Sequence, residues 1–419
     1  GMRVGFEGSQ DYDFALRAAE KARGIYHIPL ILYHWRVLPD STASSGNAKP
    51  GSIDAGRRAV QEALDRRKIP AKAYQPDWAQ KAQAGIFSHK YVLANYPSVS
   101  IIIPTKNQKK ILARCIDSLV DKTNYPNYEI MVIDNNSDEP ETIAYLKELS
   151  WKPKIKVVAV GNLQGKFNYS FINNRAVEKT VSDYVLFLNN DTEVLKDDWL
   201  TQMVGCTQIH GVGAVGARLL YHDRRIQHAG VIIKFYRGLA GHAFNGLPDW
   251  NEGYLAYAKV LRNYTAVTAA CLLTPRKLFL EMGGLDESNF GVAYNDVDYC
   301  YRFIEKGYRV VYTPEAELIH HEGFSRGFCD DIKENVNFRK KYYKSKDRFY
   351  NVSLSLENER FEIQPRCAFS GEMRKRLKVL LCTHNLNHEG APYHLYEVAI
   401  GLKQKGIIEP IVFSYTDGP

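Results

Sequence analysis

Three short polar runs, each preceded by an apolar stretch, carry the residues best suited to chemistry. They span residues 104–107, 134–138 and 189–193 and are rich in Asn, Asp, Ser and Thr. Any one of them is explained by turn formation or helix capping, which these residue types favour. Three at one edge of a sheet would instead line a polar crevice. Carboxylate and amide groups there suit a base and a ribose, and their oxygens suit the hard divalent cation that neutralises a diphosphate.

A second group of acids and histidines lies in the later half of the chain. Asp296 and Asp298 stand at the start of a predicted helix, where carboxylates cap free amides and favour the helix dipole. The alternative interpretation is catalytic, with one carboxylate removing a proton from an acceptor hydroxyl. His320 and His321 follow an apolar run. A histidine at a strand end is usually structural, but imidazole is also a competent ligand for manganese.

The elements that must position these residues alternate between strand and helix. Apolar, β-branched runs predict strands at 99–104, 128–133, 155–160 and 184–188. The segments between them predict helices at 109–121, 141–149 and 171–180. This order is typical of an α/β protein with a doubly wound, mostly parallel sheet, in which ligands bind at the carboxyl ends of strands. The three polar runs all lie at such ends.

From Val99 to His321 the chain resembles the family 2 glycosyltransferases, especially bacterial members that build O-antigen and capsular polysaccharides. The resemblance rests on an Asp after the second strand, a DxD-like triplet after the fourth, an acidic pair before a helix, and a His-x-Glu-x-x-Ser-Arg pattern. It implies the GT-A fold with a small acceptor-side subregion, a nucleotide-diphosphate sugar as donor, and Mn²⁺ or Mg²⁺ as cofactor. It matches donor binding to Pro104, Thr105, Asn107, Asp134, Asn136, Lys166, Asn189, Asn190 and Arg326, and metal binding to Asp191 and His320.

Two positions depart from the family pattern. Asn189 stands where the first acid of the DxD motif is usual, which leaves Asp191 as the expected metal ligand. Asn295 replaces the first acid of the acidic pair. The second acid of that pair acts as the base in the family, so the resemblance implies Asp296 as the catalytic base. Asp298 is then expected to cap or brace the helix.

The two ends of the chain resemble pieces of other domains. Residues 10–17 parallel residues 295–302, and the following histidine lies 34 − 11 = 23 positions after the acid, against 320 − 296 = 24. Such an internal repeat indicates a tandem arrangement. Residues 378–414 predict one strand–helix–strand unit, a partial Rossmann-like unit that resembles the opening of a family 4 GT-B transferase. We expect a C-terminal remnant of a preceding GT-A-like domain at 1–52, a helical linker at 53–95, a complete GT-A domain at 96–370 and a truncated GT-B-like start at 371–419.

Composition is that of an ordinary globular protein. Of 419 residues, 45% are hydrophobic and 24% are charged, with a net charge of +8. The excess fits a plain basic surface, or affinity for diphosphates, anionic glycans or an anionic membrane face. No apolar run approaches the roughly 20 residues of a membrane span. Seven scattered cysteines without a CxxC pair favour a reducing cytoplasm.

The expected partners are a nucleotide sugar and a glycan or lipid-linked acceptor, and nucleic acid is not expected. The expected location is the cytoplasm, with peripheral association at the inner membrane or in a glycan-assembly complex.

The sequence leaves more than one function open. The first hypothesis is an inverting, metal-dependent glycosyltransferase of polysaccharide synthesis. The second is a non-catalytic module that binds a nucleotide sugar or glycan as a scaffold, supported by Asn189 and Asn295 in place of acids. The third is a nucleotidyltransferase. That class usually has a glycine-rich phosphate loop after its first strand, and residues 105–108 contain no glycine.

Overall fold

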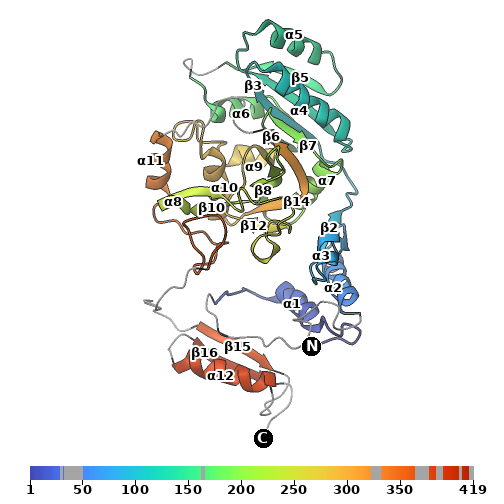
Figure 1. Ribbon diagram of the computed structural model, residues 1–419, viewed down its shortest axis with the longest axis vertical. Helices are drawn as coiled ribbons and strands as arrows, with labels where there is room; N and C mark the ends of the chain where they lie inside the picture. Colours follow the sequence, from blue (N-terminus) through green and yellow to red (C-terminus); the bar gives the residue numbers. More distant parts are fainter. Residues whose placement is uncertain are drawn as a thin grey trace. The chain divides into compact units, whose positions relative to one another are not determined.

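The computed structural model describes residues 1–28, 32, 51–161, 166–321, 332–363, 377–383, 390–404 and 408–414. The chain divides into two compact units, Gly1–Arg23 with Ser45–Ile363 and Gly24–Ser44 with Gln364–Pro419. The first unit contains the large sheet and the candidate site (Figure 1). No helix in the described ranges is long and apolar enough to cross a membrane.

A parallel half-sheet forms the first part of the large sheet. Its strand order is β5-β4-β3-β6, and all three neighbouring pairs are parallel. The strands are β3 (Val99–Thr105), β4 (Tyr128–Asp134), β5 (Ile155–Ala159) and β6 (Tyr184–Leu188). The helices between them are α4 (Lys109–Lys122), α5 (Pro140–Leu149) and α6 (Tyr169–Glu178). The predicted strands and helices are confirmed here, with ends that move by at most two residues.

The second half of the sheet is mixed in direction. β13 lies antiparallel between β6 and β8, while β8 and β14 run parallel. β7, β9 and β12 add short antiparallel pairings at the margins. These strands are β7 (Thr192–Val194), β8 (Val212–Leu220), β9 (Ile226–His228), β12 (Arg262–Tyr264), β13 (Cys271–Pro275) and β14 (Arg309–His320). The predicted α/β class with a mostly parallel sheet is confirmed.

Smaller elements complete this half. β10 (Val231–Lys234) and β11 (Leu239–His242) form a separate hairpin around α8 (Phe235–Gly238). The remaining elements are α7 (Trp199–Thr207), η2 (Tyr254–Ala256), α9 (Arg276–Glu281), α10 (Asn295–Glu305) and α11 (Ile332–Lys341).

The core fills both faces of the sheet. Alternate residues of a strand point to opposite faces, so Ile102 packs on one side of β3 while Ile101 and Ile103 pack on the other. Helices α6, α9 and α10 cover the first face, and α4, α5 and α7 cover the second. Burial on both faces explains why the strands read as continuous apolar runs.

The segment expected to be a helical linker differs from that expectation. α1 (Gln10–Lys21) packs on α2 (Ser52–Arg66), but a hairpin then follows, formed by β1 (Ala71–Tyr74) and β2 (Ser88–Tyr91) around α3 (Asp77–Lys81). β2 lies against α7, where the Tyr91 backbone N–H donates to Gln202 Oε1 at 2.9 Å. Residues 53–95 are therefore mixed in structure and belong to the same unit as the large sheet.

The second unit contains one strand–helix–strand repeat, as the sequence predicts. β15 (Leu377–Thr383) pairs in parallel with β16 (Ile408–Ser414), and α12 (Gly390–Gln404) packs on both. The helix begins at Gly390, three residues before the expected start at Tyr393, because Pro392 is compatible with a first helical turn. The likeness to a GT-B domain stays a prediction.

Candidate active site

The carboxyl ends of β3, β4 and β6 meet at one edge of the sheet and bring the three polar runs together. Asn190 Nδ2 donates to Thr105 Oγ1 at 3.0 Å, and the Asn135 backbone N–H donates to the Thr105 carbonyl at 2.8 Å. The Asn135 side chain is only 1% exposed, and within the described residues neither of its polar atoms has a hydrogen-bond partner. Pro104 precedes Thr105 in β3 and is partly exposed. The three polar runs therefore meet at one edge of the sheet, and the polar crevice expected there stays a prediction.

Asn107 ties the loops after β3 and β4 to each other. Its Oδ1 accepts from the backbone N–H groups of Asp138 and Glu139 at 2.9 and 3.1 Å, and its Nδ2 donates to Asp138 Oδ1 at 2.6 Å. Its own backbone N–H donates to Ser137 Oγ at 2.9 Å. The side chain that was matched to the donor thus holds the two loops in place.

Two further residues of the predicted donor site lie at the end of β4 and in the loop that follows it. Asp134 is partly exposed, and its Oδ1 accepts from the Ser137 backbone N–H at 3.0 Å, which leaves Oδ2 for a ligand. Asn136 is exposed and packs over Gly161, where an added Cβ would lie 3.2 Å from its Nδ2. Lys166 is exposed, and Arg326 lies outside the described residues.

The predicted metal ligands lie beside each other. His320, the last residue of β14, places Nε2 3.1 Å from Asp191 Oδ1 and 3.1 Å from Asn189 Nδ2. Asp191 and His320 are 5% and 7% exposed. They come together because β14 pairs with β7, which starts directly after Asp191. His321 points elsewhere: its Nε2 lies 2.6 Å from Glu193 Oε1.

Gln227 orients His320, and the sequence analysis did not single it out. His320 Nδ1 lies 2.6 Å from Gln227 Oε1 in a buried contact. An amide oxygen only accepts, so a hydrogen bond in this contact is donated by Nδ1, and Nε2 faces Asp191. Its neighbour His228 is fully buried, and that burial holds the pKa of His228 well below its usual range. The imidazole of His228 therefore adds no positive charge beside the site.

The geometry of this pair fits a divalent cation. His320 Nε2 and Asp191 Oδ1, a nitrogen and an oxygen of types that both ligate divalent cations, lie 3.1 Å apart. Two adjacent ligands of an octahedral cation, each about 2.1 Å from it, lie about 3 Å apart. Among the described residues no group of three or more His, Cys, Asp and Glu side chains could hold a metal. A cation here would take one oxygen and one nitrogen ligand from these two side chains and the rest from donor oxygens or water.

Asp296, the expected base, is connected to the same edge through the loop before β13. Its Oδ2 accepts from the Ala269 backbone N–H at 2.9 Å, and the next residue's carbonyl accepts from the Asn189 backbone N–H at 3.1 Å. The carboxylate is partly exposed at the first turn of α10. Two hydrogen bonds, through neighbouring residues of this loop, thus join Asp296 to the triplet at residues 189–191, which we call the donor-side triplet.

Asp298 braces the helix, as expected. It is 0% exposed, and its oxygens accept from Arg302 Nε at 2.9 Å, Lys341 Nζ at 2.5 Å and the Tyr342 hydroxyl at 2.6 Å. Asn295 Nδ2 donates to the Val292 carbonyl at 2.9 Å. Both side chains are occupied in structure, which leaves Asp296 as the partly exposed carboxylate of this turn.

Comparison with known proteins shows what the chain is similar to. Residues 100–258 match the model of glycosyl transferase family 2. Protein y4gI of Sinorhizobium fredii is 40% identical over 388 residues, covering 89% of this chain and 42% of that protein. The O-antigen biosynthesis protein RfbC of Myxococcus xanthus is 38% identical over 366 residues, covering 85% of this chain and 28% of that protein.

A third relative carries the name of an enzyme. The O-antigen chain rhamnosyltransferase RfbN of Salmonella typhimurium is 25% identical over 234 residues, covering 54% of this chain and 67% of that protein. The chain spans less than half the length of y4gI and RfbC. Over residues 100–258 the chain is thus similar to glycosyl transferase family 2.

Proposed function

We propose that this domain transfers a sugar from a nucleotide-diphosphate donor to a saccharide or lipid-linked acceptor, with inversion, during synthesis of a cell-surface polysaccharide. The observation that carries the proposal is the pairing of Asp191 with His320 at the carboxyl edge, 3.1 Å apart, with His320 oriented by Gln227. Relatives named for O-antigen synthesis support the polysaccharide.

In the donor half of the site, one group of residues would bind the nucleobase and ribose, and another would bind the diphosphate. Asp134 and Asn136 lie on the β4 loop, where Asp134 Oδ2 would accept hydrogen bonds from the base or ribose. The space between that loop and the two cation ligands would be lined by Pro104, Thr105, Asn189 and Asn190. A divalent cation, Mn²⁺ or Mg²⁺, held by Asp191 and His320 would neutralise the charge that develops on the departing diphosphate. Lys166 and Arg326 would contact the diphosphate.

The acceptor half supplies the base. Asp296 would take the proton of an acceptor hydroxyl as its oxygen bonds to the anomeric carbon. The bond from that carbon to the diphosphate breaks on the opposite face, and the nucleoside diphosphate leaves with the bonding electrons. Inversion follows because attack and departure occur on opposite faces. The loop of Ala269 would hold Asp296 against the donor-side triplet through its 2.9 Å hydrogen bond.

A lipid-linked acceptor would also bring the domain to the cytoplasmic face of the inner membrane, alone or in a glycan-assembly complex. A flotation assay with vesicles carrying such a lipid tests this: retention by plain and acceptor-bearing vesicles alike would remove the acceptor-based reason for membrane association.

The direct test of transfer is release of nucleotide from a panel of donors. The full chain with Mn²⁺ is given UDP-, GDP- and dTDP-sugars together with saccharide acceptors. We expect one donor to release its nucleotide in a metal-dependent manner. If none of the donors turns over although one of them binds, the proposal is wrong and the second function below holds.

The second candidate function is a non-catalytic module that binds a nucleotide sugar or glycan as a scaffold. Asn189 and Asn295 favour it, since each replaces an acid of the family pattern. The use of Asn295 Nδ2 in a structural hydrogen bond weakens that reading. Calorimetry with a donor, combined with a donor-hydrolysis assay, separates binding alone from binding with turnover.

A further inference from the structure

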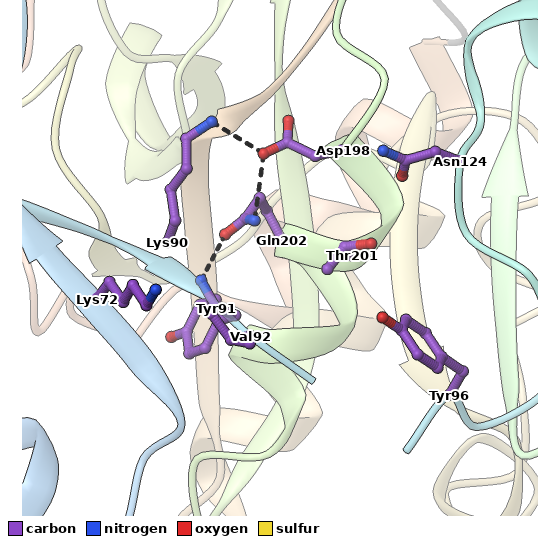
Figure 2. Close-up of a pocket in the computed structure, with 9 residues that line it drawn as sticks. All are labelled: Lys72, Lys90, Tyr91, Val92, Tyr96, Asn124, Asp198, Thr201 and Gln202. Carbon is purple, nitrogen blue, oxygen red and sulfur yellow. Dashed lines mark hydrogen bonds and ion pairs between the residues drawn. The ribbon is translucent and has the colours of Figure 1, made fainter. Parts of the chain in front are cut away.

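A hollow of about 450 Å³ lies at the opposite edge of the sheet from the candidate site (Figure 2). Tyr96 at its rim precedes β3, whereas Thr105 at the candidate site ends that strand. A strand of this length extends for roughly 20 Å at about 3.3 Å per residue. The residues that line the hollow are Lys72, Lys90, Tyr91, Val92, Tyr96, Asn124, Asp198, Thr201 and Gln202.

The hollow exists because the β1–β2 hairpin docks on α7. Tyr91 is bonded to Gln202 across this contact, and Lys90 Nζ lies 3.0 Å from Asp198 Oδ2. Figure 2 shows these bonded residues in one group. The catalytic domain supplies the other wall through Tyr96, Asn124 and Thr201. The segment before the domain and the domain itself therefore build this hollow together.

An aromatic ring and several polar groups converge on the hollow. Tyr96 is 42% exposed, and Tyr125 holds its ring edge-on at a centroid distance of 5.3 Å. Figure 2 shows Tyr96, Asn124 and Thr201 on the side facing Lys72 and Val92. Four polar side chains of the wall have no hydrogen-bond or ion-pair partner among the described residues. They are those of Tyr96, Asn124, Thr201 and Lys72. These groups are free to bind a ligand.

The wall offers hydrogen-bonding groups of several kinds, which suit a hydroxyl-rich ligand. The charges of Lys90 and Asp198 offset each other in their 3.0 Å ion pair, and Asp198 Oδ2 also accepts from Gln202. A hydroxyl both donates and accepts, so it can bond to an amide, a phenol, an ammonium and a carboxylate alike. The exposed Tyr96 ring and Val92 offer apolar surface to the C–H face of a sugar ring.

We propose that this hollow is a second saccharide site, which holds neutral sugar residues of a glycan away from the transfer site. The proposal rests on the proposed function, because a growing glycan is the ligand that would bring such sugars to the chain. The volume of the hollow falls within the range of about 300–1,000 Å³ that is usual for small-ligand pockets. Bound there, a glycan raises its local concentration at the transfer site, as in any linked pair of binding sites.

Saturation-transfer-difference NMR on the full chain tests the site. The probes are the methyl glycosides of rhamnose, mannose, galactose and N-acetylglucosamine. We expect at least one to receive saturation. Tyr96→Ala should weaken its binding by about five- to tenfold, the effect of losing one aromatic contact. The matched control is Tyr343→Ala, at a tyrosine that is 78% exposed and remote in sequence from the hollow, and it should change nothing.

Two further variants separate this site from the transfer site. Asp191→Ala should abolish donor binding and leave the saccharide signal intact, so a failed donor assay does not decide the saccharide result. Tyr96→Phe and Thr201→Val each remove only a hydroxyl and should weaken binding by a smaller factor, which covers the case in which Tyr96→Ala does not fold.

Three outcomes would overturn the proposal. The first is that no glycoside receives saturation. The second is that the signal survives in Tyr96→Ala, or in Tyr96→Phe where that variant replaces it, but is lost in Asp191→Ala. This result would place the sugar at the transfer site. The third is displacement of the glycoside by inorganic pyrophosphate in Asp191→Ala, which would make the hollow an anion site.

Discussion

Helices α1 and α10 have the same local construction but different surroundings. In each, the first acid accepts from the next backbone N–H at 2.8 Å, in Asp11 from Tyr12 and in Asp296 from Val297. The second acid is 0% exposed and pairs with an arginine four residues later. The distances from arginine Nε to carboxylate Oδ2 are 3.0 Å for Arg17–Asp13 and 2.9 Å for Arg302–Asp298.

The two helices differ in what the first acid reaches. Asp296 Oδ2 accepts from Ala269, whose loop is bonded to the donor-side triplet. Asp11 is exposed at the surface of a helix that packs on α2. Both helices thus share the buried acid–arginine pair, and the proposed base Asp296 differs from Asp11 in its connection to the carboxyl edge of the large sheet.

The largest expected effect comes from the first acid. Asp296→Asn should lower transfer by about 10²–10⁴-fold, because an amide cannot take the acceptor proton, while donor binding stays at the wild-type level. The measurement is released nucleotide, with donor binding by calorimetry. The matched variant Asp11→Asn should leave both unchanged. Full transfer by Asp296→Asn would disprove the assignment of the base.

The second acid should matter for stability in both helices, but unequally. Asp298→Ala leaves Arg302 and Lys341 without their carboxylate and should cost about 3–5 kcal/mol of stability. Asp13→Ala should cost less, about 1–2 kcal/mol, because the hydrogen-bond partners of Asp13 are two partly exposed arginines, whereas Asp298 also accepts from the buried Tyr342 hydroxyl, which Asp298→Ala would leave without its partner. Thermal unfolding midpoints compare the two, and equal losses would show that the braces are equivalent.

Gln227 lies beside the carboxyl edge of the large sheet, to which α10 is connected through Asp296, whereas α1 has no such connection among the described residues. Gln227→Leu removes the acceptor that orients His320 and should weaken Mn²⁺ binding by about 10–100-fold. The conservative Gln227→Glu keeps an acceptor oxygen and should restore most of that affinity. Mn²⁺ titration followed by electron paramagnetic resonance reads this without turnover. Unchanged affinity in Gln227→Leu would mean that His320 needs no support.

The smallest effect is the acid sensitivity of the α1 brace. Its hydrogen bond from Arg3 is the main reason that the pKa of Asp13 is lowered from 3.8 to about 2. A carboxyl with a lowered folded-state pKa contributes stability above its unfolded pKa and loses it as the pH falls toward the folded value. Local unfolding of α1 should therefore begin between about pH 4 and pH 2. Hydrogen exchange of its amides measures this, and Asp13→Asn should remove the dependence.

The sequence predicted the parallel half of the sheet well because burial on both faces leaves a plain signal. The run Val99–Thr105 is apolar and β-branched, and the structure buries it from both sides. Asp191 and His320 were matched to a metal site by the resemblance to a known family, and the structure places them side by side. Their contact, however, is made by pairing between β7 and β14, which local patterns do not encode.

Other features depend on long-range contacts and were missed. The β1 and β2 strands read Ala-Lys-Ala-Tyr and Ser-His-Lys-Tyr, which lack β-branched residues; they pair with each other, β1 packs on α2, and β2 packs on α7. The role proposed for Gln227 depends on its contact with His320, which lies 93 positions away in the sequence. A polar Gln-His pair inside a short buried strand is the one local signal that would have marked it.

The most direct test of the central claim is calorimetric titration of the full chain with UDP, GDP and dTDP, in Mn²⁺ and again in EDTA. The claim is that Asp191 and His320 hold a cation against a donor diphosphate. It predicts that one nucleotide binds in Mn²⁺, that chelation abolishes this binding, and that Asp191→Ala reproduces the loss. Equal binding with and without metal, or in Asp191→Ala, would contradict it.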